Sequence, residues 1–413
     1  MSSYRGSYRG LHGGRGGGSW RGGADLSRAG PPHIVSPPKP LGPTIDSINI
    51  KTLLVEEDAP TIKDVEYVAS YNWISGKSPV ILVPGSPPAW TPPATDPQLK
   101  PDSEDVFRDI NAAQYASYPM EPTFRSLQAM QPHYDLQAVD IVGCGSTIGN
   151  LLRFAGSESR TFRFDIDVIG DTVLFIRRES SPTELITDLR GYGHTFPEAY
   201  TTWDSEVRSS CSHQRIIQYE FGGLNFLVRT ETDGYVKETD AKAPSSLAKS
   251  RGQLPLDDAL GTMAVSSTEV AQDQGLQLKT QGMRVRQDQI FDIKTRASYK
   301  PFDMNEILPR LWVNQTSKFL IAYHQSGLFD KPEVEDARQE VIRWENGHSA
   351  LLARFHAVVK RIVDVVRDSD QQQCEVSWDG QGPLCVTKQI GEGRRALPSD
   401  LLHLLNPPIG DRS

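Results

Sequence analysis

Short apolar runs separated by turn residues mark the first half of the chain. Residues 47–100 contain runs such as PVILVPG that are interrupted by PPAWTPP, a pattern typical of extended segments and turns rather than helices. Residues 138–180 have the composition of strands, and the IGD of FRFDIDVIGDTVLFIRRE predicts a hairpin-like reversal. A second hairpin is predicted around Gly222 and Gly223 in HQRIIQYEFGGLNFLVRTETDGYV.

Helical patterns occur later in the chain. We predict helices over about 183–208, 303–318 and 333–368, the last of which contains the amphipathic run ALLARFHAVVKRIVDVV. Two closing strands, CEVSW and LCVTKQI, flank the turn DGQGP. The chain is therefore expected to form a mixed α+β domain with central, largely antiparallel sheets flanked by helices.

Two regions lack the apolar periodicity of a packed domain. Residues 1–23 combine glycine with arginine and aromatic side chains and have no acid, and residues 31–43 are rich in proline. Such a tail cannot bury enough apolar surface to fold; it is suited to contact RNA phosphates and bases, although a tail without a partner is equally consistent. Residues 237–285 are polar and predict an insertion. We expect a disordered tail over 1–46 and one domain over 47–406.

Composition and charge narrow the class of protein. In a chain of 413 residues, 38% hydrophobic and 23% charged residues are typical of a globular protein with some disordered polar sequence. The sequence has neither an apolar run of membrane-spanning length nor a hydrophobic signal core, so we expect a nuclear or cytoplasmic protein that is not secreted. The net charge of −8 argues against coating of nucleic acid by bulk electrostatics.

Candidate chemistry lies on two predicted strands. In QIFDIKTRASY, alternation places Asp292 and Lys294 on one face; taken alone, such a pair is usually a surface ion pair worth ~0–1 kcal/mol. The strand that precedes the polar insertion ends with Glu231 and Asp233, again on one face. Converging carboxylates are costly without a cation, and Mg²⁺ or Mn²⁺ prefers oxygen ligands. Such an ion activates water and binds phosphodiester oxygens while a lysine orients the water, which predicts a metal-dependent nuclease.

The order of these motifs resembles that of the DXO-type decapping exoribonucleases, which have the PD-(D/E)XK nuclease fold. The chain contains GHTFPE, then Glu231-Thr232-Asp233, then Asp292-Ile293-Lys294, then LWVNQ, then Ala322-Tyr323-His324. The segments DIVGCGSTIGNLL, VSWDGQGPLCVTKQ and ALPSDL also resemble the family, and the resemblance spans 47–406. The chain is thereby identified as a divergent, fungal-like member.

The resemblance implies an RNA 5′-end processing hydrolase of the decapping or 5′–3′ exoribonuclease type that uses Mg²⁺ or Mn²⁺. It also implies RNA as a partner and a partner nuclease as a further candidate. The implied metal ligands are Glu198, Glu231, Asp233, Asp292 and the Ile293 carbonyl; the implied catalytic residues are Lys294, Asp292 and Asp233; the implied substrate-binding residues are Gln315, Lys294 and His324. Because the acids repel one another without a metal, removing Asp292 is expected to maintain or raise the stability of the metal-free protein.

Departures from the family pattern affect the substrate more than the chemistry. Gly145 and His324 stand where the family has arginines, and those arginines are expected to contact RNA phosphates. The preferred 5′ end is therefore left open. Asp292 replaces the usual glutamate with a shorter side chain that still coordinates metal. The lost arginines favour an alternative, namely a catalytically weak relative that binds RNA or stabilises a partner nuclease.

Two rival assignments have weaker support. Gly143, Gly145 and Gly149 follow a predicted strand, as in nucleotide-binding and methyltransferase folds, but the next segments are hairpins rather than repeated βαβ units. A prenyl-diphosphate synthase would need paired aspartate-rich helical motifs, yet the sole Asp-Asp pair, Asp257-Asp258, lies in the polar insertion. The histidines are not spaced as a zinc site.

Overall fold

The computed structural model describes residues 40–406, apart from 57–58, 77, 188, 238–274 and 371. Most of the predicted tail over 1–46 and most of the predicted insertion over 237–285 lie outside these residues. Within the described part of the chain, no helix has the length and apolar character needed to cross a membrane.

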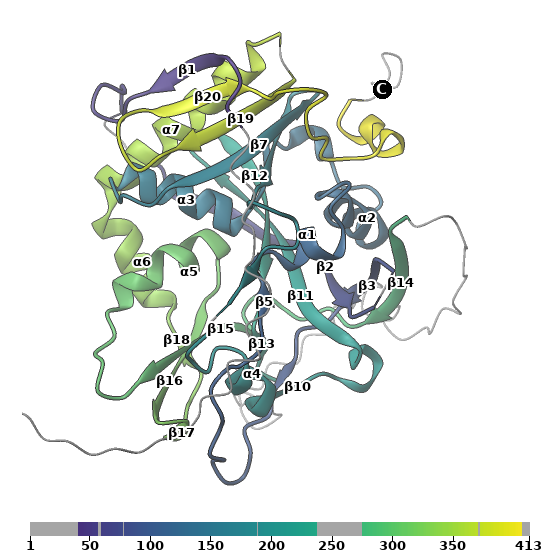
Figure 1. Ribbon diagram of the computed structural model, residues 1–413, viewed down its shortest axis with the longest axis vertical. Coiled ribbons are helices and arrows are strands. Elements are labelled where there is room, and N and C mark those ends of the chain that lie inside the picture. The colour runs from purple at the N-terminus through teal and green to yellow at the C-terminus, as the bar shows by residue number, and fades with distance from the viewer. Residues whose placement is uncertain are drawn as a thin grey trace, which may run out of the picture. The chain divides into compact units, whose positions relative to one another are not determined.

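Eleven strands of the described residues form one sheet in the order β1-β20-β19-β7-β8-β6-β12-β11-β2-β3-β14 (Figure 1). Its strands are β1 (Thr44–Ile48), β20 (Leu384–Lys388), β19 (Gln373–Trp378), β7 (Phe162–Ile169), β8 (Thr172–Arg177), β6 (Ile141–Cys144), β12 (Leu224–Glu231), β11 (Ser210–Phe221), β2 (Ile62–Ile74), β3 (Val80–Gly85) and β14 (Gln277–Gly282). Most neighbours are antiparallel; β6 runs parallel to β8 and β12, and β14 runs parallel to β3. The predicted, largely antiparallel sheet is confirmed, whereas a repeated βαβ fold is not present among the described elements.

Both predicted hairpins are confirmed. Gly170, with φ of +59°, turns the chain between β7 and β8. Gly222 and Gly223, with φ of +64° and +77°, turn it between β11 and β12. Glycine suits these positions because side chains disfavour positive φ. The last part of the polar stretch 237–285 is β14, so the first sheet includes residues that the sequence assigned to an insertion.

Helices cover both faces of this sheet (Figure 1). On one side lie α3 (Gly145–Ala155), α5 (Leu308–Asn314), α6 (Arg338–Gly347) and α7 (Ser349–Arg367), with the 3₁₀ turn η6 (Met304–Glu306) before α5. On the other side lie α1 (Ile110–Gln114), α2 (Glu121–Met130) and the 3₁₀ segments η2 (Leu136–Ala138) and η7 (Ser399–Leu404). Successive residues of β12 pack against the two layers, since Phe226 and Val228 join one apolar cluster and Leu227 joins the other. Helices are present within both later predicted spans, 303–318 and 333–368, although Lys318 already belongs to a strand and Glu335–Asp336 form another.

The helix predicted over 183–208 is wrong in extent. In that region the structure has β9 (Leu185–Ile186), α4 (Thr195–Tyr200), β10 (Thr201–Thr202) and the 3₁₀ turn η3 (Ser205–Val207); β9 pairs with β5 (Val106–Phe107). The Asp102 carboxylate accepts hydrogen bonds from the backbone N–H groups of Gly193 at 2.8 Å and Thr195 at 3.0 Å, which fixes the start of α4. The helix ends at Thr201, whose backbone is extended.

A second sheet of seven described strands has the order β10-β4-β13-β15-β16-β17, with β18 paired to β16. Its further strands are β4 (Ala89–Trp90), β13 (Gly234–Tyr235), β15 (Ile290–Ala297), β16 (Lys318–Gln325), β17 (Leu328–Phe329) and β18 (Glu335–Asp336). The chain leaves the first sheet after Glu231 and enters the second at Gly234, which pairs with Phe291 of β15. The predicted E-x-D motif therefore lies at the junction of the two sheets.

Candidate active site

Asp233 and Asp292 come together at this junction. The backbone N–H of Ile293 donates a hydrogen bond to Oδ2 of Asp233 at 2.7 Å, which brings the Asp233 side chain beside β15. Asp292 is only 2% exposed, and Asp233 keeps partial access to solvent. Two carboxylates from distant parts of the sequence thus meet at one position.

The group that joins these two carboxylates is the guanidinium of Arg310. Its Nε donates to Asp292 Oδ2 at 2.8 Å and its Nη2 donates to Asp292 Oδ1 at 2.5 Å, a bidentate pair. The same Nη2 lies 3.6 Å from Asp233 Oδ2. Arg310 is not among the site residues predicted from the sequence; the excess of acids indicates that a cation is needed, but no sequence pattern indicates which side chain supplies it.

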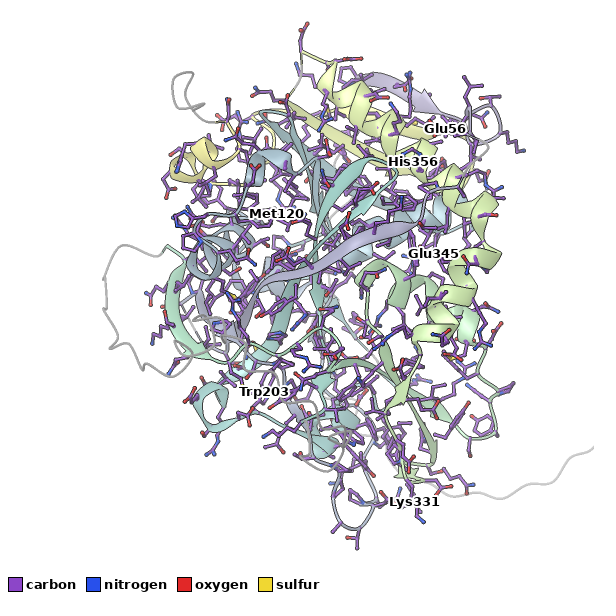
Figure 2. All side chains as sticks on the ribbon, turned by 180° about the vertical axis from the view of Figure 1, so that it is seen from behind. Glu56, Met120, Trp203, Lys331, Glu345 and His356 are labelled. Carbon is purple, nitrogen blue, oxygen red and sulfur yellow. The ribbon has the colours of Figure 1, made fainter. Side chains whose placement is uncertain are left out.

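Helix α5 holds Arg310 in place through a buried anchor. Nε1 of Trp312 donates to Oε1 of Glu345 at 2.8 Å, and the same oxygen accepts the backbone N–H of Ile62 at 3.0 Å. Glu345 of α6, which is labelled in Figure 2, thereby ties α5 to β2 of the first sheet. Because Trp312 is 1% exposed, the helix has little freedom to move, while the Arg310 side chain keeps 48% of its surface accessible.

Burial and repulsion act together on Asp233. Burial, and then the neighbouring Asp292 carboxylate, raise the pKa of Asp233 to about 7, although Arg310 and the Ile293 N–H oppose the rise. The Arg310 guanidinium and the Ile293 N–H therefore offset only part of the effect of burial and of the Asp292 charge on Asp233.

Glu231 lies at the edge of the centre, between two groups of charges. Burial and then Asp109 raise the pKa of Glu231 above its usual range, whereas Arg310 and Arg177 lower it. The Glu231 residue is exposed to solvent, although protein atoms surround its carboxyl group. Asp109 caps α1 and lies 3.8 Å from Arg177, so the two charges that act on Glu231 from this side also pair with each other.

Lys294 and Gln315 differ in how they are held. Lys294 is exposed, follows the alternation that puts it on the Asp292 side of β15, and has no hydrogen bond or ion pair within the described residues. Gln315 caps α5 in the left-handed conformation with φ of +49°, and its side-chain amide donates to the Trp312 carbonyl at 2.5 Å. Lys294 is thus available to a ligand, whereas the Gln315 amide is turned back onto its own helix.

Glu198 does not join the acids in this structure. It is exposed on α4, whose Phe196 belongs to one apolar cluster with Phe291 and Ile293 of β15. Because alternate residues of a strand point to opposite faces, α4 covers the face of β15 opposite to Asp292. Glu198 would have to move to reach the Asp233–Asp292 centre.

His324 lies farther along the second sheet. It pairs with Ala297, whereas Asp292 pairs with Phe319, so five residues of β16 separate His324 from the acids, a span of ~17 Å. Its ring packs against Tyr192, with ring centroids 4.4 Å apart, and burial lowers its pKa. In this arrangement His324 is part of an aromatic cluster rather than of the acidic centre.

The donor set limits what ion could bind. Within the described residues, no group of three or more histidine, cysteine, aspartate or glutamate side chains is arranged to hold a metal ion. Two converging carboxylates nevertheless fit a Mg²⁺-like ion, which is commonly bound by one or two carboxylates together with water and substrate phosphate. Both oxygens of Asp292 are bonded to Arg310, so the fit requires the guanidinium to move away.

The position of the expected family arginine is closed. A Cβ atom added to Gly145 would lie 2.2 Å from Oδ1 of Asn314 and 3.4 Å from the Thr230 side chain. Gly145 begins α3, and Asn314 ends α5. The Asn314 side chain therefore takes the space that a side chain at position 145 would need.

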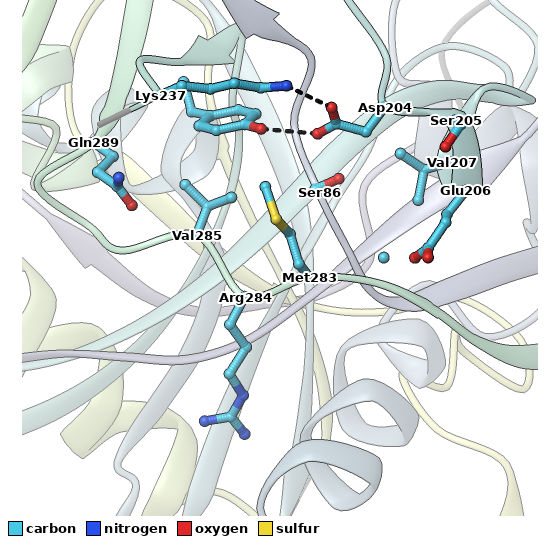
Figure 3. A pocket seen from close by; sticks show the side chains of 12 residues that line it. Ser86, Asp204, Ser205, Glu206, Val207, Lys237, Met283, Arg284, Val285 and Gln289 are labelled. Atoms are coloured by element: carbon cyan, nitrogen blue, oxygen red, sulfur yellow. Dashed lines mark hydrogen bonds and ion pairs between the residues drawn. The ribbon is translucent and has the colours of Figure 1, made fainter. Parts of the chain in front are cut away.

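A separate pocket of about 640 Å³ lies beside β13 (Figure 3). Its walls include Ser86, Met283 and Arg284, and the Asp204 carboxylate in it accepts hydrogen bonds from Tyr235 Oη and Lys237 Nζ, both at 2.8 Å. The residues that line it are Ser86, Asp204, Ser205, Glu206, Val207, Tyr235, Lys237, Gly282, Met283, Arg284, Val285 and Gln289. None of the three acids Glu231, Asp233 and Asp292 is among them, so the pocket is distinct from the acidic centre.

Comparison with known families shows which family the chain belongs to. Residues 53–386 match the family described as a domain of unknown function, DUF8563. The chain belongs to the DUF8563 family. No curated protein matches this DUF8563 member in sequence.

Solved structures show the fold of this DUF8563 member. Rai1 of S. pombe matches with a TM-score of 0.53 at 9% identity, over 84% of this chain and 99% of that one. Scheffersomyces stipitis Rai1 in complex with (3′-NADP)⁺ and calcium matches with a TM-score of 0.54 at 10% identity, over 86% and 97%. Candida albicans Rai1 in complex with pU5-Mn²⁺ matches with a TM-score of 0.53 at 10% identity, over 88% and 98%. The resemblance to the DXO-type family is thus confirmed as a shared fold.

Proposed function

We propose that this DUF8563 protein is a divalent-metal-dependent hydrolase that acts on the 5′ end of RNA. The observation that carries the proposal is the convergence of Asp233 and Asp292 on one cation position at the sheet junction, with the Arg310 guanidinium 2.5 Å from one carboxylate and 3.6 Å from the other. The shared fold adds support, since Candida albicans Rai1 has been crystallised with pU5 and Mn²⁺.

In the proposed site, Asp233 and Asp292 would hold Mg²⁺ or Mn²⁺. Such an ion lowers the pKa of a bound water and stabilises charge on phosphate oxygens. Lys294 would donate hydrogen bonds to the attacking water from the same face of β15, and its exposure leaves its ammonium group available. Glu231, whose pKa is raised by burial, would be a ligand of a second ion.

Other parts of the proposal rest on the resemblance or on composition alone. The resemblance supplies metal binding by Glu198 and the Ile293 carbonyl, substrate contacts by Gln315 and His324, a single domain over 47–406, and a partner nuclease. Composition supplies RNA contacts by residues 1–23 and a nuclear or cytoplasmic location. Glu198→Gln tests the first of these, since it should weaken cleavage only if α4 moves toward the acids.

The decisive experiment is digestion of RNA by the full-length purified chain. RNA labelled at its 3′ end and carrying a 5′ monophosphate, a 5′ triphosphate or a 5′ cap would be incubated with Mn²⁺, Mg²⁺ or EDTA. We expect cleavage of at least one substrate with metal and none with EDTA or with Asp292→Asn. Absence of cleavage for all three 5′ ends at saturating Mn²⁺ would contradict the proposal.

A second candidate function is favoured by one observation. Because Arg310 engages both oxygens of Asp292, the centre is already neutralised in part without any metal, as expected for a catalytically weak relative that binds RNA or stabilises a partner nuclease. This candidate predicts that RNA binds the purified chain, measured by fluorescence anisotropy, but is not cleaved when Mn²⁺ is present.

A further inference from the structure

We propose that Arg310 closes the acidic centre of the metal-free protein and competes with divalent cations for Asp233 and Asp292. The inference deepens the proposed function, on which it rests in taking these two carboxylates as the cation ligands. It assigns to Arg310 control over whether a metal can enter.

Arg310 occupies the Asp292 oxygens that a divalent cation would need. A guanidinium has only donors, and here two of its N–H groups take both carboxylate oxygens of Asp292, at 2.8 and 2.5 Å. A divalent cation would need the lone pairs of the same oxygens. The two cannot hold Asp292 in this way at the same time, and two positive charges within a few ångströms of each other also repel.

Arg310 is a permanently charged competitor for these carboxylates. Arginine keeps its charge throughout the accessible pH range, so Arg310 cannot leave by losing a proton. Only a cation that binds the carboxylates more strongly, or a movement of the side chain, can open the centre.

The Arg310 side chain can move while its helix stays in place. Trp312 is buried and bonded to Glu345, so α5 is fixed two residues away from Arg310. The Arg310 side chain is 48% exposed, which leaves it a path into solvent. Opening therefore requires a rotamer change of one long side chain and no rearrangement of the helix.

A metal titration tests the proposal. Thermal unfolding of the full-length protein would be followed at increasing Mn²⁺ and Mg²⁺ for the wild type, Arg310→Gln, Arg310→Lys and the control Arg343→Gln. Arg343 is an exposed arginine of α6 that pairs with Glu340, so it matches the change in charge without a contact to Asp233 or Asp292 among the described ion pairs. Metal binding to the folded state raises its stability by RT ln(1 + c/Kd) at a metal concentration c, so the metal concentration at which stabilisation begins gives Kd, the half-saturating concentration, without any activity.

We expect Arg310→Gln to lower the half-saturating Mn²⁺ concentration ~10-fold or more, since removing a competitor restores the full population of the binding-competent state. Arg310→Lys, which loses the bidentate geometry, should lie between this variant and the wild type, and the control should match the wild type. Equal half-saturation in the wild type and in both Arg310 variants would overturn the inference.

The outcomes separate this inference from the proposed function. If Arg310→Gln gains a metal response that the wild type lacks, Arg310 is the competitor and the wild type is not a metal-dependent hydrolase under those conditions. If the wild type cleaves RNA with Mn²⁺ and binds Mn²⁺ as tightly as both Arg310 variants do, the proposed function stands and the inference fails. Circular dichroism checks that each variant is folded, and Arg310→Lys decides the question if Arg310→Gln is not.

Discussion

The Asp233 carboxylate accepts the backbone N–H of Ile293 at 2.7 Å, and this bond ties the end of the first sheet to β15 of the second. Asp233→Asn keeps an acceptor oxygen and removes a charge that Asp292 repels, whereas Asp233→Ala removes both. We expect Asp233→Asn to be as stable as the wild type or more stable in EDTA, and Asp233→Ala to be less stable by ~1 kcal/mol. Urea denaturation in EDTA measures this difference, and equal loss in the two variants would show that the hydrogen bond is not the relevant contact.

The ion pair with Arg310 changes the expected effect of removing Asp292 on the stability of the metal-free protein. Repulsion among the acids, the sole effect that the sequence indicates here, predicts that removing this acid maintains or raises the stability of the metal-free protein. Since Asp292 is buried and accepts two charged hydrogen bonds, we expect Asp292→Ala to lower the free energy of unfolding by ~1.5–3 kcal/mol in EDTA, with the half-exposed Arg310 favouring the lower end. Denaturant unfolding provides the measurement, and no loss of stability would argue against the ion pair in solution.

Lys294 offers the opposite pattern. Its side chain is exposed and makes no ion pair within the described residues, so Lys294→Ala should change stability by less than ~0.5 kcal/mol. If it orients the attacking water, as we propose, the same change should reduce RNA cleavage by ~10²–10⁴. Single-turnover cleavage under saturating metal is the measurement, and Lys300→Ala is a matched control on the loop after β15. Unaltered cleavage by Lys294→Ala would show that Lys294 is an ordinary surface residue without a role in the reaction.

Gly145 and Asn314 should be coupled. Gly145→Ala places a Cβ at 2.2 Å from Asn314 Oδ1, so one side chain must shift, and we expect a loss of ~1–3 kcal/mol. Asn314→Ala removes that oxygen, so the double variant should lose less than the sum of the two single variants. A double-mutant cycle of unfolding free energies measures the coupling, and additive losses would exclude the close contact.

His213 should make stability depend on pH. Its ring is 1% exposed, Nδ1 lies 2.6 Å from Oδ1 of Asn72, and Nε2 has no partner among the described residues. Burial, and then Arg215, lower the pKa of His213 well below its usual range. Below pH ~6.5 the unfolded chain gains a proton that the folded protein does not, so stability falls as pH falls, by at most ~1.4 kcal/mol per pH unit.

Asp233 contributes with the opposite sign. Its pKa is raised from 3.8 to about 7, so the folded state binds more protons between these values and stability falls as pH rises. The contribution of His213 is therefore measured as the difference between the wild type and His213→Gln from pH 5 to 7.5. We expect the wild type to lose more stability than the variant on acidification, and parallel curves would contradict the assignment.

The sequence predicted what depends on local pattern. Glycine-centred hairpins, the strands after residue 370 and the amphipathic α7 follow from turn chemistry and periodicity, and they are where they were expected. The approach of Asp233 to Asp292 followed from the family resemblance and from strand alternation. The helix over 183–208 failed because Asp102, ~90 residues earlier, fixes the start of α4 through backbone hydrogen bonds that no local pattern contains.

Arg310 was out of reach for a different reason. In LPRLWVN it is one arginine among many on a short helix, and its direction depends on the Trp312–Glu345 bond and on the packing of α5 beside the sheet junction. The same holds for Glu198, whose distance from Asp292 depends on which face of β15 α4 covers. Sequence order gives the residue types of a site, whereas tertiary packing decides which of them meet.

Because Asp233 follows the first sheet and Asp292 belongs to the second, any cation that binds both carboxylates also holds the two sheets together. Detachment of β15 from its two-residue neighbour β13 and release of that cation are then one linked equilibrium. Amide hydrogen exchange in Gly234, Tyr235 and the start of β15 would slow in proportion to cation occupancy. The acidic centre would in this way control how large a fraction of molecules has this small strand pair open to solvent. The bound cation could be a metal ion or the arginine of the protein itself.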